Sequence, residues 1–194
     1  MLRELDLPGI LLSEPTCHGD DRGVFHEWFR GSEFSTKTGY KFDLRQANMS
    51  TSQAAVLRGL HYAEVPPGQA KYVVCPVGSI LDVIVDIRVG SPNFGKHVAI
   101  ELSADNRHGV FIPVGFAHGF VALEASTVAY LTTAEYSPTT EHTINPFDKE
   151  LAIQWPGESH ILSPRDAAAP ALTEAPLPTF EDCVAYEESL RGAR

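Results

Sequence analysis

The stretch Leu81-Asp82-Val83-Ile84-Val85-Asp86-Ile87-Arg88 carries the strongest secondary-structure signal of the chain. Its odd-numbered residues are all aliphatic, whereas Asp82, Asp86 and Arg88 at even positions carry charge. Strict alternation, with several β-branched residues, is typical of a β-strand whose two faces meet different surroundings. We therefore expect a strand here, with its carboxylates on one face.

Shorter segments on both sides of this stretch have the same β-prone composition, and turn-forming runs such as Pro66-Pro67-Gly68 separate them. Many short strands at near-regular spacing, with few helical patterns, indicate a sandwich, barrel or jelly roll. A short helix is expected at Glu33–Gly39, and a C-terminal helix at Phe180–Arg191 follows a proline-rich run. The further expected strands are Val24–Phe29, Phe42–Ser50, Ala55–Tyr62, Tyr72–Pro76, His97–Leu102, Gly109–Ile112, Gly119–Ala122 and Val128–Thr133.

The length and charge of the chain limit the kinds of protein it can be. Its 194 residues predict a single domain, with a core at about residues 20–165 and a C-terminal tail and helix at 166–194. The net charge of −10 argues against a nucleic-acid partner, because nucleic-acid binders use a positive field. A few Arg or Lys side chains that converge locally would still bind a small phosphorylated ligand.

Cysteine content and hydropathy point to a soluble cytoplasmic protein. Cys17, Cys75 and Cys183 are far apart and form no CxxC pair, which argues against a disulfide framework or a zinc site. No stretch approaches the ~20 apolar residues that span a bilayer, and the N-terminal segment lacks the apolar run of a signal peptide. We therefore expect no membrane partner.

The segment Val56–Tyr62 places two basic side chains, Arg58 and His61, in a β-prone stretch. An ideal strand would put them on opposite faces, but a bulge at Gly59 would bring them together. Lys71 opens the next expected strand just past a turn, so the three side chains would form a local cationic pocket. The alternative is that His61 is a hydrogen-bonded core histidine and that Arg58 lies at the surface.

A Pro-x-Gly turn at Pro113–Gly115 leads to His118 in an apolar strand, a spacing that resembles the second motif of cupins, where this histidine can bind a metal. The first cupin motif requires a His-x-His pair, which is missing because Tyr62 and Ala63 follow His61. Since zinc and iron sites need three or four converging ligands, we expect no metal here. A hydrogen bond between His118 and a buried Asp82 is the preferred interpretation.

Two tyrosines and one aspartate complete the set of candidates. Tyr130 lies in the middle of an expected strand, where an interior phenol needs a polar partner, and Tyr136 follows six residues later. Asp166 lies outside any strong strand pattern, where it could fold over the barrel mouth and orient a catalytic histidine. The alternative is that both tyrosines are ordinary strand aromatics and that Asp166 is one surface acid among many.

Together these segments resemble the dTDP-4-dehydrorhamnose 3,5-epimerase family, and in particular its actinobacterial members. The resemblance covers nearly the whole chain, from Asp21-Arg22-Gly23-Val24-Phe25-His26-Glu27 to Arg165-Asp166-Ala167-Ala168-Ala169-Pro170. It implies an all-β, cupin-type jelly roll that works as a homodimer, with no metal and no cofactor. The motifs that match between those ends include Arg45-Gln46-Ala47-Asn48, Leu57-Arg58-Gly59-Leu60-His61-Tyr62, Gln69-Ala70-Lys71-Tyr72 and Phe116-Ala117-His118-Gly119-Phe120.

The same resemblance implies a role for each candidate residue. His61 would be the base paired with Asp166, Tyr130 the acid on the opposite sugar face, and Lys71 the group near the keto oxygen. Arg22 matches a position that can reach in from the partner subunit. Tyr136 matches a position near the nucleotide, Asp82 and His118 a second His–carboxylate pair, and Arg165 a substrate-placing position where many relatives have lysine. The positions that match nucleotide and diphosphate contacts are Arg22, Phe25, Glu27, Gln46, Asn48 and Arg58.

Epimerisation beside a ketone explains why such residues are needed together. A carbon-bound proton is removed and another is returned from the opposite face, while charge moves onto the carbonyl oxygen. Histidine suits the base because it titrates near neutrality, and a carboxylate partner raises its basicity. A lysine in a water-poor cavity stabilises the enolate oxygen, and a phenol donates a proton without permanent charge. No G-x-G-x-x-G follows a strand, which argues against hydride chemistry on a dinucleotide.

The implied reaction converts dTDP-4-dehydro-6-deoxy-D-glucose, by inversion of carbons 3 and 5, to dTDP-4-dehydro-L-rhamnose. The motifs Glu135–Pro138 and Glu141–Ile144 favour this rhamnose-pathway reaction over inversion of a single centre for an antibiotic sugar. Two alternatives of other classes are a metal-dependent cupin and a non-catalytic cupin that binds sugar nucleotides.

Overall fold

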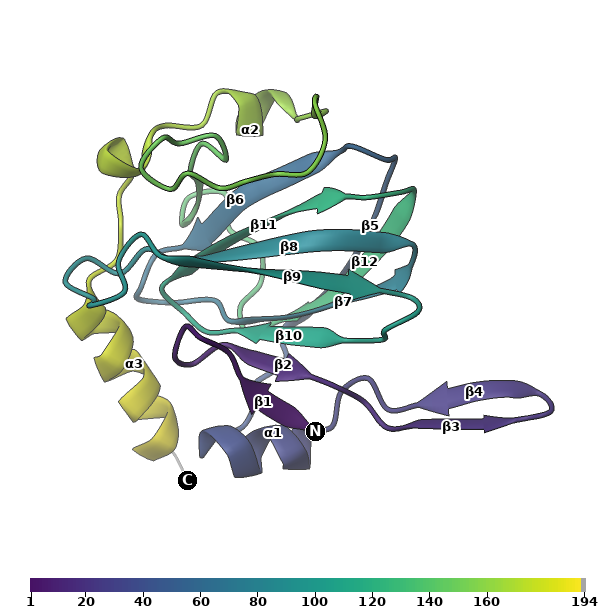
Figure 1. Ribbon diagram of the computed structural model, residues 1–194. Helices are drawn as coiled ribbons and strands as arrows, with labels where there is room; N and C mark the ends of the chain where they lie inside the picture. The colour runs from purple at the N-terminus through teal and green to yellow at the C-terminus, as the bar shows by residue number, and fades with distance from the viewer. Residues whose placement is uncertain (193–194) are drawn as a thin grey trace.

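Two antiparallel sheets face each other in the computed structural model, which describes residues 1–192 (Figure 1). One sheet has the strand order β1-β2-β10-β7-β12-β5, the other β13-β6-β11-β8-β9, and β3 and β4 form a separate hairpin. The expectation of an all-β sandwich is therefore confirmed. The strands are β1 (Leu2–Glu4), β2 (Leu11–Ser13), β3 (Cys17–Asp20), β4 (Gly23–His26), β5 (Gln46–Ser52), β6 (Leu57–Ala63), β7 (Lys71–Val77), β8 (Ser79–Asp86), β9 (His97–Ser103), β10 (Gly109–Ile112), β11 (Phe116–Ala122), β12 (Ser126–Thr132) and β13 (Glu141–Thr143).

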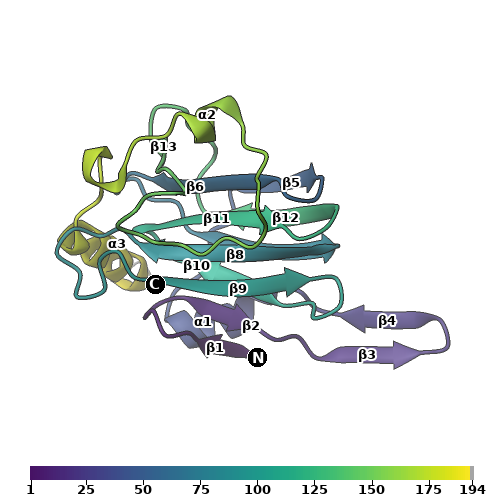
Figure 2. The same cartoon turned by 45° about the horizontal axis from the view of Figure 1, so that its top comes forward.

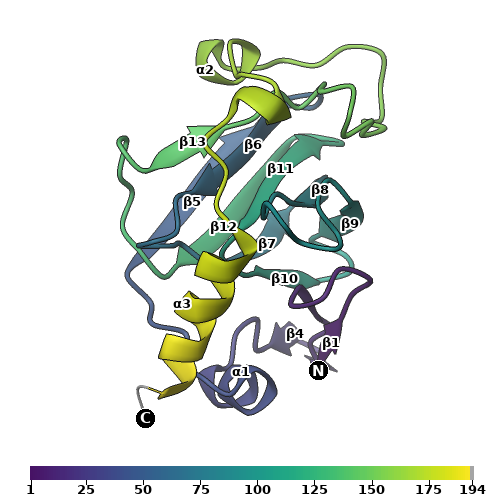
Figure 3. The same ribbon diagram turned by 90° about the vertical axis from the view of Figure 1, so that its left-hand side faces the viewer.

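The helices are few and lie outside the two sheets. They are α1 (Gly31–Thr38), α2 (Pro164–Ala167), η1 (Leu172–Glu174) and α3 (Phe180–Gly192). Both expected helices are present: α3 begins at the expected residue, and the other ends are shifted by one or two residues. The end of α3 lies beside α1 (Figure 3). A bond of 3.3 Å from Arg191 Nε to the Thr38 carbonyl joins them. Within residues 1–192, no helix has the length and apolar character needed to cross a bilayer.

Both faces of β8 are buried, which explains its alternating sequence. Ile80 and Ile84 pack in the cluster between the two sheets. Val83 and Val85 pack on the outer face, beneath the segment that runs from β13 to α3 and covers this sheet (Figure 2). Because residues 80, 82 and 84 share one face, Asp82 lies on the interior side of the sheet. The charged face of the pattern is therefore the one that faces the inside of the sandwich.

Several strand ends differ from the sequence expectation. The strand expected at Val24–Phe29 is the shorter β4, and its hairpin with β3 projects away from the sandwich (Figure 1). The strand expected at Phe42–Ser50 begins only at Gln46, since Phe42 packs edge-on against Phe34 of α1 with ring centroids 5.5 Å apart. The strands β1, β2, β3 and β13 were not expected, because each has only three or four residues and at most one of them is β-branched.

A bulge at Gly59 in β6 brings Arg58 and His61 to the same side. In the pairing of β6 with β11, His61 lies opposite His118 and Arg58 opposite Phe120, so β6 contains one extra residue. Gly59 has a φ of +120°, and a Cβ atom there would lie 2.6 Å from Cα of Gly119. Only glycine fits where the two strands approach this closely. The expected bulge is confirmed.

Candidate active site

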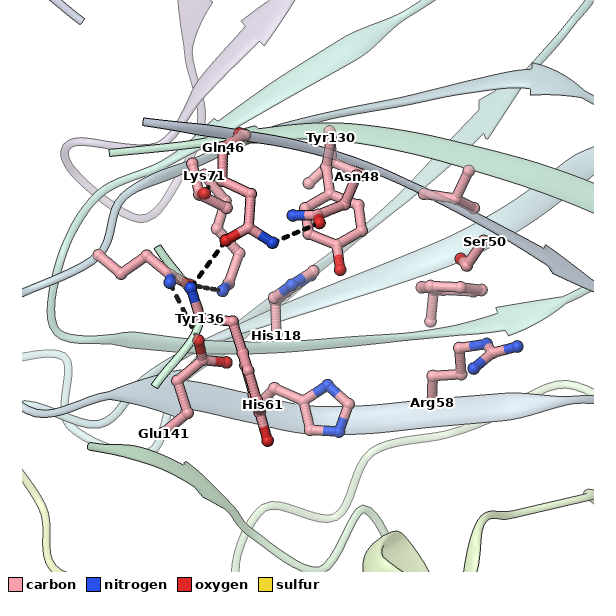
Figure 4. Close-up of a pocket in the computed structure, with 15 residues that line it drawn as sticks. Gln46, Asn48, Ser50, Arg58, His61, Lys71, His118, Tyr130, Tyr136 and Glu141 are labelled. Atoms are coloured by element: carbon pink, nitrogen blue, oxygen red, sulfur yellow. Dashed lines mark hydrogen bonds between the residues drawn. The ribbon is translucent and has the colours of Figure 1, made fainter. Parts of the chain in front are cut away.

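A cavity of about 240 Å³ lies between the two sheets, and both sheets contribute side chains to it. Figure 4 shows His61 of β6 and Tyr130 of β12 approaching this cavity from opposite sides. The structure therefore brings together residues that are up to 95 positions apart in the chain, Gln46 and Glu141. The predicted site residues that line the cavity are Gln46, Asn48, Arg58, His61, Lys71, His118, Tyr130 and Tyr136.

Asp166 lies behind His61 and fixes the state of its ring. The carboxylate Oδ1 is 2.8 Å from His61 Nε2, and Ser163 caps α2 by accepting a bond from the backbone N–H of Asp166. Burial disfavours the charge of Asp166, but the hydrogen bond and charge of His61, with Ser163, outweigh burial and lower its pKa. An ionised carboxylate can only accept hydrogen bonds, so Nε2 carries the ring proton and Nδ1 remains as the basic atom.

Lys71 and Tyr130 are both tuned by burial. Desolvation lowers the pKa of the fully enclosed Lys71, and the nearby carboxylate of Glu141 partly opposes that shift. Desolvation raises the pKa of Tyr130, the charge of Glu141 raises it further, and Arg58 acts in the opposite direction. Tyr130 therefore keeps its proton at neutral pH and can act as an acid.

A second His–carboxylate pair lies in the neighbouring strands. His118 Nδ1 is 3.3 Å from Oδ1 of Asp82, which has no exposed surface. This contact agrees with the expectation for His118. Because His118 lies opposite His61 in the sheet, the two rings enter the cavity side by side.

Polar side chains at the two ends of the cavity offer contacts to a larger ligand. Gln46 donates to Asn48 Oδ1 at 2.6 Å and accepts from the backbone N–H of Tyr136 at 2.8 Å. Arg58 donates from Nε to Ser52 Oγ at 3.0 Å. Figure 4 shows Gln46 and Tyr136 at one end and Arg58 at the other. Tyr136 is 54% exposed, so this end opens to solvent.

Asp82 and Asp166 lie behind the cavity histidines, and four other predicted site residues lie away from the cavity. Arg22 pairs with Asp20 near the tip of the β3–β4 hairpin, Phe25 is exposed on β4, and Glu27 pairs with Arg30. Arg165 is also exposed and donates from Nη2 to the Glu141 carbonyl at 2.7 Å. A single copy of the chain therefore does not bring Arg22, Phe25 or Glu27 to the cavity.

Seven of the fifteen cavity residues were not among the predicted site residues, and Gln69 and Glu141 are the two whose side chains bond to or act on Lys71. Gln69 precedes Lys71 in a matched motif, and Glu141 opens β13, whose three residues show no strand period. Glutamine and glutamate are common surface residues, so their type alone carried no signal.

Among residues 1–192, no three His, Cys, Asp or Glu side chains converge in a way that would hold a metal ion.

Comparison with known proteins gives a consistent assignment. Residues 4–174 match the family model described as dTDP-4-dehydrorhamnose 3,5-epimerase. A protein of the same name from Mycolicibacterium smegmatis is 49% identical, over 97% of this chain and 96% of its own. The solved structure of an rmlC epimerase from Mycobacterium tuberculosis superposes with a TM-score of 0.96 at 46% identity, covering 98% of this chain and 100% of that one.

A further solved relative has a narrower stated activity. It is a 3'-monoepimerase from Streptomyces bikiniensis in complex with dTDP-quinovose, with a TM-score of 0.93 and 40% identity over 96% of this chain and 98% of that one. These structures share the fold over almost the full length, which confirms the cupin-type jelly roll. The matched model and the full-length relatives together show that the chain belongs to the dTDP-4-dehydrorhamnose 3,5-epimerase family.

Proposed function

We propose that this family member inverts carbons 3 and 5 of dTDP-4-keto-6-deoxyglucose by proton transfer alone. The observation that carries the proposal is the position of His61 and Tyr130, which enter one cavity from opposite sides. Carbons 3 and 5 both flank the ketone at carbon 4, so their protons are acidic for the same reason. The same residues can therefore act on each centre in turn.

His61 begins each inversion as the base. Its Nδ1 takes the proton from the carbon beside the ketone, and the bonding electrons move onto the keto oxygen as an enolate. Asp166 stabilises the imidazolium that forms, because its pKa is already lowered by contact with His61. Lys71 in the same cavity donates to the enolate oxygen, where a charged donor is effective because Lys71 itself is only 7% exposed.

Tyr130 completes the inversion from the other side. Its raised pKa keeps the phenol protonated until the enolate carbon accepts the proton. His61 then releases its proton to solvent, and Tyr130 takes up a proton from solvent, before the next inversion. The electrons stay with the sugar throughout, so the reaction is a heterolytic isomerisation.

The nucleotide is proposed to occupy the polar ends of the cavity. Gln46, Asn48 and the half-buried Arg58 would contact the nucleotide and its diphosphate, and Tyr136 would lie near the nucleotide. Arg165 holds the start of β13 through the Glu141 carbonyl and would place the substrate from that edge. Asp82 would orient His118 toward the sugar.

A homodimer would explain the residues that lie outside the cavity. The β3–β4 hairpin projects from the sandwich (Figure 2). Arg22 lies at its turn, and Phe25 is 66% exposed. Trp28 and Met49 line an apolar hollow of about 370 Å³ on the same side of the molecule. We propose that a second copy covers this surface and that its Arg22 and Phe25 reach the first copy's nucleotide.

Analytical ultracentrifugation tests whether the chain is a dimer. The affinity of Arg22→Glu for dTDP tests the contact across the dimer, and an affinity equal to that of the wild type would refute that contact.

Deuterium exchange tests the reaction itself. The protein is incubated with dTDP-4-keto-6-deoxyglucose in deuterated water, without added metal or cofactor, and the product is analysed by NMR. Double inversion predicts deuterium at both carbon 3 and carbon 5. Deuterium at carbon 3 alone would favour a single-centre epimerase, the activity named for the Streptomyces bikiniensis relative. Absence of label at both centres would refute the proposal.

A further inference from the structure

The amide of Gln69 lies between two charged groups of the cavity. Lys71 Nζ donates a hydrogen bond to Gln69 Oε1. On its other side, Gln69 Nε2 donates to Glu141 Oε1 at 3.1 Å and to the Ala134 carbonyl at 3.3 Å. One neutral side chain thus connects the lysine ammonium to the glutamate carboxylate.

The charges fix the orientation of this amide. An amide has one acceptor end and one donor end, and the ammonium offers only donors while the carboxylate offers only acceptors. The oxygen must therefore face Lys71 and the nitrogen must face Glu141. Gln69 and Lys71 are 8% and 7% exposed, so water can scarcely replace either bond.

The backbone holds Gln69 firmly in this position. The turn before it closes with a bond of 2.8 Å from Gly68 N–H to the Glu64 carbonyl. Ala70 N–H then donates to Thr133 Oγ1 at 2.9 Å, and Thr133 N–H returns to the Ala70 carbonyl at 3.1 Å. Residue 69 is therefore held next to the Ala70–Thr133 pair, just past the end of β12 and just before β7 begins.

We propose that Gln69 is a positioning residue, which aims Lys71 Nζ at the substrate's keto oxygen and couples it to the carboxylate of Glu141. The inference rests on the proposed function, since it deepens the role of Lys71 there. Gln69 is the hydrogen-bond acceptor of the Lys71 ammonium among residues 1–192, and its amide nitrogen is the donor to the Glu141 carboxylate, so its removal would break both bonds. The lysine would then lose both its direction and its link to the negative charge.

Several other groups that titrate or carry charge face the same cavity. They come from each packed strand: Arg58 and His61 from β6, His118 from β11 and Tyr130 from β12. Glu141 from β13 is the carboxylate that acts on the pKa of Lys71, and it opposes the lowering caused by burial. A change at residue 69 therefore alters the acceptor of Lys71 and leaves these other groups in place.

Lysine NMR tests the coupling without requiring turnover. The chain has five lysines, and Lys71→Met assigns the ε-carbon signal of Lys71 in protein labelled at that carbon. Gln69→Glu places a carboxylate beside Nζ and is expected to raise the pKa of Lys71 by about 1–3 units. Gln69→Leu removes the acceptor and is expected to lower it. Gln53→Glu adds the same charge at an exposed position and is expected to leave it unchanged.

Shifts of opposite sign distinguish positioning from a purely structural role. If Gln69 were purely structural, the two variants would change the pKa of Lys71 in the same direction or not at all. Either result would overturn the proposal. If circular dichroism shows that Gln69→Leu is unfolded, Gln69→Met provides the apolar replacement at the original length.

Kinetics complete the test. Gln69→Leu is expected to lower kcat about tenfold to a hundredfold with little change in KM, because the lost interaction forms with the developing enolate. The kcat–pH profile of Gln69→Leu should shift in the same direction as the pKa of Lys71 measured by NMR. A wild-type kcat together with an unshifted profile would contradict the proposal. Wild-type activity is measured first: an inactive wild type refutes the proposed function, whereas the NMR shifts still decide the coupling of Gln69 to Lys71.

Discussion

Replacement of Asp166 by asparagine tests how His61 is activated. Asp166→Asn keeps the size of a buried side chain whose carboxylate lies 2.8 Å from His61 Nε2. It removes the negative charge that stabilises the imidazolium during proton abstraction. The amide can also donate to Nε2, which would move the ring proton to Nδ1 and remove the basic atom from the cavity.

The structure sets the size of the effect. A hydrogen bond to a charged group contributes about 1.5–3 kcal/mol, which corresponds to about tenfold to 150-fold in rate. The His61 side chain is 34% exposed, so solvent screening places the loss of charge alone near tenfold. The change of tautomer adds to this loss, and the corresponding substitution in a serine protease triad costs ~10⁴-fold. We therefore expect kcat of Asp166→Asn to fall by at least about tenfold.

The assay is turnover of dTDP-4-keto-6-deoxyglucose, with dTDP affinity measured by calorimetry. Affinity should stay at the wild-type value, because Asp166 does not line the cavity. Asp6→Asn, which removes an exposed carboxylate, serves as the matched control and should retain full activity. Wild-type kcat in Asp166→Asn, with an unchanged pH profile, would refute the assigned role.

Three further substitutions address the acid, the buried lysine and the bulge. Tyr130→Phe should lower kcat by about 10²–10⁴-fold while dTDP affinity stays unchanged; equal losses in both would contradict a role as acid. Lys71→Met should raise the melting temperature at pH 7, because burial lowers the pKa of Lys71, so a charged Lys71 destabilises the folded state. That gain should shrink as the pH rises toward the unfolded lysine pKa of ~10.4, and a gain that grows with pH would contradict the direction of the shift. Gly59→Ala should lower the free energy of unfolding by about 1–3 kcal/mol in urea and reduce kcat, whereas Gly31→Ala, which has room and no positive φ, should do neither.

Local pattern predicted much of the fold. The alternation in β8 and the glycine in β6 were sufficient to place a strand and a bulge, because both depend on neighbouring residues. The first two strands, Leu2–Glu4 and Leu11–Ser13, were missed because each has only three residues. Their conformation depends on pairing, of β1 with β2 and of β2 with the distant β10. Tertiary contacts of this kind leave no period in the sequence.

The site was predicted less evenly than the fold. His61 and Asp166 are 105 positions apart and lie 2.8 Å apart in the structure. The sequence suggested that Asp166 could orient a histidine, and the family resemblance identified that histidine as His61. Gln69 and Glu141 were missed, because their importance lies in what they face inside the cavity. Arg22 illustrates the opposite limit, since its proposed role depends on a second copy of the chain.

The central claim is that the imidazole of His61 removes the sugar protons. Its most direct test is deuterium wash-in at carbon 3 of dTDP-4-keto-6-deoxyglucose, measured by NMR for the wild type and for His61→Asn at equal protein concentration. His61→Asn should bind dTDP as tightly as the wild type and incorporate label at a rate reduced by at least about a hundredfold. Wash-in at the wild-type rate in a folded His61→Asn protein would show that another group is the base.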